Sequence, residues 1–116
     1  MSSEGLEVEV EPRECWALSF RRQGREVARA QIHRHSGDVF EVVDLYVVPE
    51  CRGRGLAKQV LSYCLDFIRA RGGRMAVAHT SPENAPAFRL FSRQGFLPCL
   101  SELHLELALD HHRPHP

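Results

Sequence analysis

The chain has 116 residues, which at about 100–150 residues per domain predicts one domain. Hydrophobic residues make up 43% and charged residues 26%, a globular balance that excludes disordered and collagen-like chains. The 15 basic and 15 acidic side chains cancel, so net charge indicates neither a nucleic acid nor a membrane as a partner.

The N-terminus and the cysteines predict the compartment. No apolar run approaches the ~20 residues of a membrane helix, and residues 1–5 lack the basic and apolar regions of a signal peptide. Cys15, Cys51, Cys64 and Cys99 form no C-x-x-C pair, which argues against a zinc site. A chain that can build an ordinary core needs no disulfide framework. We therefore expect a cytoplasmic protein that binds no metal.

The first half of the chain predicts strands. Apolar and acidic residues alternate over 6–11. Further strands are expected over 15–20, 26–33 and 39–48, separated by short turn-forming segments, and the last of them is rich in β-branched and aromatic residues. This succession predicts an antiparallel meander.

The second half predicts helices that alternate with strands. Apolar residues recur at spacings of three and four over 57–68, the pattern of an amphipathic helix. Asn84 is a typical N-cap for a second, shorter helix, which Gly95 would close. Further strands are expected at 74–79, 96–97 and 103–109. The order is β-β-β-β-α-β-α-β, a mixed α+β fold in one domain over 1–110, with a disordered tail over 111–116.

A glycine-rich turn lies between the fourth predicted strand and the first predicted helix. Gly53 and Gly55 permit tight backbone geometry and expose N–H groups. The helix N-terminus adds unpaired donors and partial positive charge, and Arg52, Arg54 and Lys58 surround them with cations. This arrangement predicts an anion site suited to a pyrophosphate.

Two motifs resemble one enzyme family. The turn lacks the third glycine of the dinucleotide fingerprint and is no P-loop. Its R-x-x-G-x-A pattern (Arg52, Gly55, Ala57) resembles the acyl-CoA pyrophosphate loop of the GNAT superfamily of N-acetyltransferases. Residues 84–96 resemble the family's later motif, N-x-x-A-x-x-L-Y-x-x-x-G-F. The resemblance covers roughly residues 25–107. It implies a GNAT-type mixed, mostly antiparallel twisted sheet with two main helices, here lacking the usual N-terminal helices.

The resemblance also implies acetyl-CoA as co-substrate and an amine, in a small molecule or a peptide, as acceptor. In the family, the strand before the loop offers backbone groups to the pantetheine arm, and the later motif packs beside the pantetheine and its thiol. The expected cofactor-binding residues are Tyr46, Val47, Val48, Arg52, Gly53, Arg54, Gly55, Leu56, Ala57, Lys58, Asn84, Phe88 and Phe91.

Three residues are candidates for the base that takes the amine's proton. His79 stands where related alanine-tail and protein N-terminal acetyltransferases have a glutamate base, and an imidazole titrates near neutrality. A strand-end histidine without a role is the alternative. Other members use a carboxylate on the strand that here carries Glu41 and Asp44. Alternation puts these two on opposite faces unless a bulge intervenes, so we expect one at most at the site, Asp44 being preferred.

Phe91 departs from the family pattern, which has a tyrosine there as general acid near the CoA sulfur. The departure favours an alternative function, a non-catalytic acyl-CoA-binding or regulatory module. His33 and His35 share one strand face. Without a third ligand, a solvated or substrate-facing pair is favoured over a metal site.

The expected lack of N-terminal helices has a consequence for assembly. Those helices wall the acceptor pocket in relatives, so the pocket here would be open or completed by another subunit. Apolar surface near Trp16, Phe20 and Phe40 would be left uncovered, and such patches mark subunit contacts. We therefore predict a homodimer.

Overall fold

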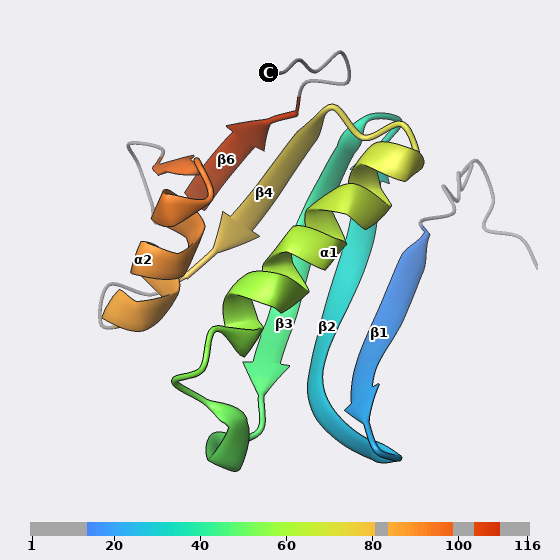
Figure 1. Cartoon of the computed structure of the whole chain (residues 1–116). Helices are drawn as coiled ribbons and strands as arrows, with labels where there is room; N and C mark the ends of the chain where they lie inside the picture. The colour runs from blue at the N-terminus through green and yellow to red at the C-terminus, as the bar shows by residue number, and fades with distance from the viewer. Residues whose placement is uncertain (1–13, 81–83, 99–103, 110–116) are drawn as a thin grey trace, which may run out of the picture.

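One six-stranded sheet, in the order β1-β2-β3-β4-β6-β5, organises the part of the chain that the computed structural model describes, residues 14–80, 84–98 and 104–109 (Figure 1). The strands are β1 (Cys15–Arg22), β2 (Arg25–Ser36), β3 (Val39–Val47), β4 (Met75–His79), β5 (Leu97–Pro98) and β6 (His104–Ala108). The helices are α1 (Leu56–Ala70) and α2 (Ala85–Arg93), and a short 3-10 turn, η1, spans Pro49–Cys51.

The predicted order of elements is confirmed from β1 onward. β1, β2 and β3 form an antiparallel meander, β3 and β4 are parallel, and β6 lies antiparallel between β4 and β5. The sheet is therefore mixed and mostly antiparallel, as expected. The predicted strand over 6–11 and tail over 111–116 lie outside the described residues.

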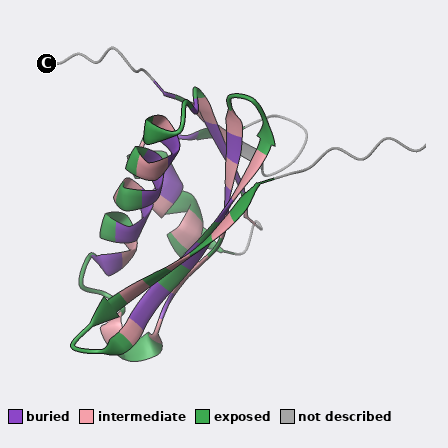
Figure 2. Ribbon diagram, turned by 90° about the vertical axis from the view of Figure 1, so that its right-hand side faces the viewer, coloured by how far each residue is buried: buried purple, intermediate pink, exposed green. Residues whose placement is uncertain are grey.

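Both helices cover the same face of the sheet (Figures 1 and 2). The buried stripe of α1 consists of Leu56, Val60, Leu61, Cys64, Leu65 and Ile68. Small residues of β2, Ala28 and Ala30, are fully buried beneath it and allow the helix to approach the sheet closely. α2 adds Phe91 to the same core, and its N-cap is Asn84, whose side-chain oxygen accepts a hydrogen bond from the N–H of Ala87 at 3.2 Å.

The expectation of uncovered apolar surface on the first strands is wrong. Phe40 is fully buried. Trp16 stacks on Phe40 with ring centroids 6.0 Å apart and meets Phe67 of α1 edge-on at 5.4 Å. Phe20 packs edge-on against Tyr63, also of α1, at 5.4 Å. These side chains alternate onto the face that α1 covers, so the homodimer prediction loses its physical support.

β3 and β4 form only a short seam. Three residue pairs join them: Val39 with Met75, Phe40 with Ala76, and Glu41 with Val77. β3 then continues to Val47 and β4 to His79 without further pairing between the two strands. The strands therefore diverge toward their C-terminal ends, and in Figure 1 both arrows point downward, with β4 ending well above β3.

Candidate active site

The N-terminus of α1 lies at the end of the sheet toward which β3 runs (Figure 1). Gly53 and Gly55 have φ of 79° and 80°, in the left-handed region that favours glycine. A Cβ on either would meet nothing within 4 Å, so the backbone conformation, and not crowding, requires glycine. The space in front of both is open to a ligand.

The loop and the first turn of α1 present a row of N–H donors. Within the described residues, the main-chain N–H groups from Gly53 to Lys58 have no protein acceptor. The first that has one is the N–H of Gln59, which donates to the carbonyl of Gly55 at 3.2 Å. Such donors at a helix N-terminus form an anion-binding site.

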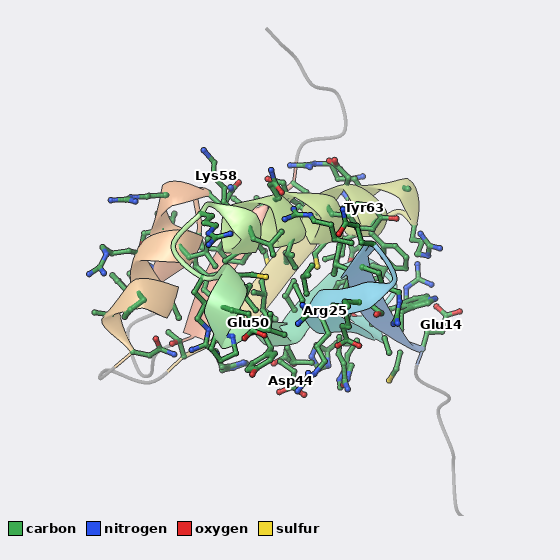
Figure 3. The ribbon with its side chains drawn as sticks, turned by 60° about the horizontal axis from the view of Figure 1, so that its bottom comes forward. Glu14, Arg25, Asp44, Glu50, Lys58 and Tyr63 are labelled. Atoms are coloured by element: carbon green, nitrogen blue, oxygen red, sulfur yellow. The ribbon has the colours of Figure 1, made fainter. Side chains whose placement is uncertain are left out.

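The three cations of the loop differ in their contacts. Arg52 is partly engaged by the protein: its Nε donates to the carbonyl of Val47 at 2.7 Å, and its guanidinium lies 5.3 Å from the ring centroid of Tyr46. Arg54 and Lys58 are exposed, and Figure 3 shows Lys58 on the side of α1. Arg54 and Lys58 are thus available to phosphate oxygens, while Arg52 also holds the end of β3.

The backbone groups expected to meet the pantetheine arm are partly occupied. The N–H of Val48 donates to the carbonyl of Val27 at 3.0 Å, and the carbonyl of Val47 accepts from Arg52. Those two groups therefore already have partners. On the side that faces β4, the backbone of β3 has no strand partner after Glu41, a stretch that begins before Val47 and Val48 in the chain.

On α2, the two phenylalanines of the expected cofactor set differ in exposure. Phe91 is 6% exposed, and its ring packs edge-on against Phe96 at 5.1 Å. Phe88 is 36% exposed. Asn84 uses its side chain as the helix cap. Phe91 is thus a core residue, and Phe88 is the one that offers surface to a ligand.

A bulge in β3 changes the expected placement of the two carboxylates. Arg29 pairs with Tyr46 and Gln31 with Val43, so Ala30 faces two β3 residues, Asp44 and Leu45. Asp44 has a φ of 52°. The extra residue takes Asp44 out of strict alternation, and Figure 3 shows it on the side of the sheet opposite α1. Glu41 faces that side too, where it meets His35 and His79.

Glu41 joins two histidines from the neighbouring strands. Its Oε1 lies 2.6 Å from Nε2 of His35 on β2, and its Oε2 lies 3.0 Å from Nδ1 of His79 on β4. The Glu41 side chain is only 15% exposed. Burial raises the pKa of this carboxyl, but the hydrogen bonds from His35 and His79 lower it more, so the net pKa lies below the ordinary value of 4.5. The carboxylate stays ionised beside either imidazole.

Of the predicted base candidates, the structure therefore brings together Glu41 and His79. No hydrogen bond or ion pair links Asp44 to either of them in the described part of the chain. His33 and His35 do share a face, as predicted, but they have different partners: His33 Nε2 lies 3.3 Å from Oε1 of Gln31. The role of His35 was missed because only strand register brings it to Glu41.

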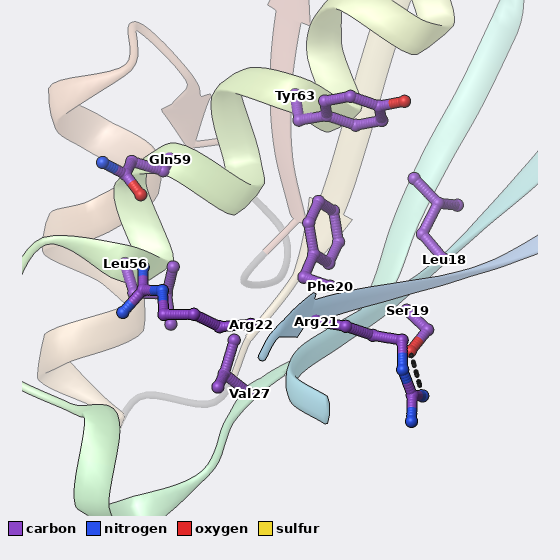
Figure 4. Close-up of a pocket in the computed structure, with 9 residues that line it drawn as sticks. All are labelled: Leu18, Ser19, Phe20, Arg21, Arg22, Val27, Leu56, Gln59 and Tyr63. Atoms are coloured by element: carbon purple, nitrogen blue, oxygen red, sulfur yellow. Dashed lines mark hydrogen bonds between the residues drawn. The ribbon is translucent and has the colours of Figure 1, made fainter. Parts of the chain in front are cut away.

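Two cavities lie on opposite sides of the sheet. One, of about 410 Å³, is on the open face and is lined by Arg29, Gln31, Asp44, Leu45 and Tyr46. The other, of about 420 Å³, lies between the end of β1 and α1 and is lined by Leu18, Ser19, Phe20, Arg21, Arg22, Val27, Leu56, Gln59 and Tyr63 (Figure 4). The first shares its face with Glu41 and His79 and is the cavity relevant to their chemistry.

The described residues contain no group of three or more His, Cys, Asp or Glu side chains placed to hold a metal ion. Their three cysteines, Cys15, Cys51 and Cys64, are free thiols, and burial raises the pKa of Cys64 to about 12. No described helix combines the length and the apolar character needed to span a membrane.

Comparison with known proteins places this geometry in a family. The model of the acetyltransferase (GNAT) family matches residues 4–96. Streptothricin acetyltransferase of Streptomyces lavendulae is 33% identical over 58 residues, which are 50% of this chain and 31% of that protein. N-alpha-acetyltransferase 30 of Schizosaccharomyces pombe is 29% identical over 73 residues, 63% of this chain and 49% of that protein. The matches thus span less than half of either relative.

Solved structures share the fold. A GNAT family acetyltransferase from Elizabethkingia anophelis with acetyl-CoA bound has a TM-score of 0.75 at 11% identity, covering 80% of this chain and 75% of that one. The PaiA N-acetyltransferase of Thermoplasma acidophilum, in complex with coenzyme A, has a TM-score of 0.74 at 15% identity, covering 82% and 61%. With the family model matching most of its length, the chain belongs to the acetyltransferase (GNAT) family.

Proposed function

We propose that this protein is an acetyl-CoA-dependent N-acetyltransferase that transfers the acetyl group to an amine by direct attack. One observation carries the proposal: the Glu41–His79 pair lies where the pairing of β3 and β4 ends, and β3 runs on from there toward the donor-rich start of α1. In this arrangement the CoA pyrophosphate binds the N–H groups from Gly53 to Lys58. The pantetheine arm extends between the strands toward the pair.

The residues where β3 and β4 part supply the groups needed to acetylate an amine. The amine nitrogen attacks the thioester carbonyl, the C–S bond breaks, and His79 takes the amine's proton. Glu41 orients the imidazole through Nδ1 and stabilises the imidazolium that forms. Phe91 has no proton to give, so the CoA thiolate leaves without an acid from that position.

The acceptor itself is a small-molecule or peptide amine that approaches over the face opposite α1. The two curated relatives have names that point to different acceptors, so neither is carried over to this chain. We also propose a cytoplasmic location, because acetyl-CoA is available there and the three described cysteines are free thiols.

Two measurements test the proposal. Calorimetry with acetyl-CoA should detect binding, and release of CoA thiol in the presence of a panel of amines should detect transfer. His79→Ala should lower turnover about 10²-fold or more with little change in acetyl-CoA affinity. If His79→Ala keeps wild-type turnover while Asp44→Asn does not, the base is Asp44.

The same measurements separate the second candidate function. Acetyl-CoA binding without thiol release for any amine would favour a non-catalytic acyl-CoA-binding or regulatory module, as does the absence of a hydroxyl at Phe91. Absence of acetyl-CoA binding would contradict both functions.

A further inference from the structure

The cavity of about 410 Å³ on the open face has a charge pattern that selects a ligand. Its lining includes two charged side chains, Arg29 and Asp44, and the amide of Gln31. The cavity lies on the same face of the sheet as the Glu41–His79 pair. β3 connects the two sites, because it carries both Glu41 and Asp44. An acceptor whose amine reaches His79 can therefore extend along β3 to this cavity.

The charge of Arg29 is already balanced. Its guanidinium lies 3.6 Å from a carboxylate oxygen of Glu26 and 4.4 Å from the ring centroid of Tyr46. Arg52 also lies over the ring of Tyr46, and it belongs to the loop in which the pyrophosphate is proposed to bind. The cations near the cavity thus have anionic or aromatic partners, or an expected phosphate.

The charge of Asp44 is not balanced. Within the described residues its carboxylate has no ion pair and no hydrogen bond, although it lines the cavity. The bulge that adds Asp44 to β3 is also what turns this side chain toward the open face (Figure 3). The cavity therefore presents one uncompensated negative charge, which favours a cation.

The position of Asp44 along β3 sets the reach of that cation. Asp44 lies three positions after Glu41, and a rise of ~3.3 Å per residue puts their backbones roughly 10 Å apart. A positive group at Asp44 therefore lies several bonds from an amine nitrogen at His79.

We propose, building on the proposed acetyl transfer, that the acceptor carries a second positive charge several bonds from its reacting nitrogen, and that Asp44 binds this second charge. Diamines with a flexible aliphatic spacer are the simplest members of this class. Asp44 is then a specificity residue for the acceptor, and the proton is taken by His79.

Three acceptors with a six-carbon chain test this assignment: hexamethylenediamine, which can react at either of two equivalent ends, and hexylamine and ε-aminocaproate, which have one primary amine each. They end in a cationic, a neutral and an anionic group. We expect kcat/KM to be highest for the diamine and lowest for the aminocaproate. Asp44→Asn should raise KM for the diamine about tenfold, leave its kcat unchanged, and leave KM for hexylamine unchanged. Raising the salt concentration should narrow the gap between diamine and hexylamine.

The matched control is Asp66→Asn, the same chemical change on an exposed residue of α1 that pairs with Arg69. It should leave all three KM values unchanged. Asparagine tolerates positive φ, so Asp44→Asn keeps the bulge. A fall of kcat for hexylamine in Asp44→Asn would overturn the assignment, since Asp44 would then act at the reacting nitrogen. A preference for ε-aminocaproate would also overturn it, in favour of Arg29.

A binding measurement separates this inference from the proposed function. Calorimetry of hexamethylenediamine with the CoA-bound protein requires no turnover. Binding about tenfold tighter to the wild type than to Asp44→Asn supports the cation site even if no acetyl group is transferred. Equal binding by the two proteins contradicts it even if transfer is observed.

Discussion

The Oε2 atom of Glu41 lies 3.0 Å from Nδ1 of His79, and Glu41 occupies the last paired position before β3 and β4 separate. A second histidine, His35, approaches the other oxygen of the same carboxylate at 2.6 Å. The contact therefore joins three strands at the point where the sheet opens.

The Glu41 cluster should make stability depend on acid pH. The net pKa of this carboxyl lies below 4.5 in the folded protein, so its contribution to stability is present above the unfolded pKa and is lost as pH falls through the folded pKa. We expect Glu41→Gln to flatten this acid limb in denaturant unfolding measured across pH. Asp66→Asn, on the exposed side of α1, should keep the wild-type slope, and an unchanged slope in Glu41→Gln would contradict the assignment.

Gly55→Ala should weaken acetyl-CoA binding through the loop backbone. The residue has φ of 80°, so a side chain strains this conformation by about 1–2 kcal/mol and shifts the N–H donors. Gly24→Ala is a matched control, because Gly24 has φ of 79° and equally open surroundings but lies in the β1–β2 turn. Both variants should lose similar stability in thermal unfolding, and only Gly55→Ala should lose affinity in calorimetry. Equal affinities would count against the loop as the pyrophosphate site.

Arg52→Ala and Arg54→Ala should differ in stability. Each removes a cation from the loop and should cost about 1–3 kcal/mol of acetyl-CoA binding. Both side chains are exposed, but Arg52 also donates to the carbonyl of Val47 and lies over the ring of Tyr46, contacts that Arg54 does not make within the described residues. We therefore expect only Arg52→Ala to lower the midpoint of denaturant unfolding. The contact of Arg52 with β3 would be unimportant if the two midpoints were the same.

Phe88→Ala and Phe91→Ala should separate ligand contact from core packing. Phe91 is 6% exposed and packs on Phe96, so its truncation should cost about 3–5 kcal/mol of stability. Phe88 is 36% exposed, so its truncation should change stability little and weaken acetyl-CoA binding if α2 lies beside the pantetheine. Thermal unfolding and calorimetry on the same samples give both values. Wild-type affinity in Phe88→Ala would remove α2 from the binding site.

Local chemistry explains what could be predicted from the sequence. The turn at Gly53 and Gly55 and the cap at Asn84 depend on residues within a few positions of each other, and both are in the structure as expected. The amphipathic period of α1 likewise predicted its buried face. The family motifs added the fold, because their spacing requires one helix and one strand between them.

The remaining features depend on register between distant segments. His35, Glu41 and His79 meet only because of how β2, β3 and β4 are aligned, and no local pattern encodes this. The bulge at Asp44 is invisible to strict alternation, which therefore placed Asp44 and Glu41 on opposite faces. Phe91 was assigned to the ligand from a motif, while its burial against Phe96 follows from how α2 packs on the core.

The short seam between β3 and β4 also divides the molecule in two. Three residue pairs connect the β1–β2–β3 meander to the β4–β6–β5 half, fewer than join β1 to β2, β2 to β3 or β4 to β6. Such a boundary is where a protein opens sub-globally, without unfolding throughout. A ligand lodged between the halves would bind both and couple them into one cooperative unit. We expect amide hydrogen exchange along β4 to slow on addition of acetyl-CoA well beyond the residues that touch it.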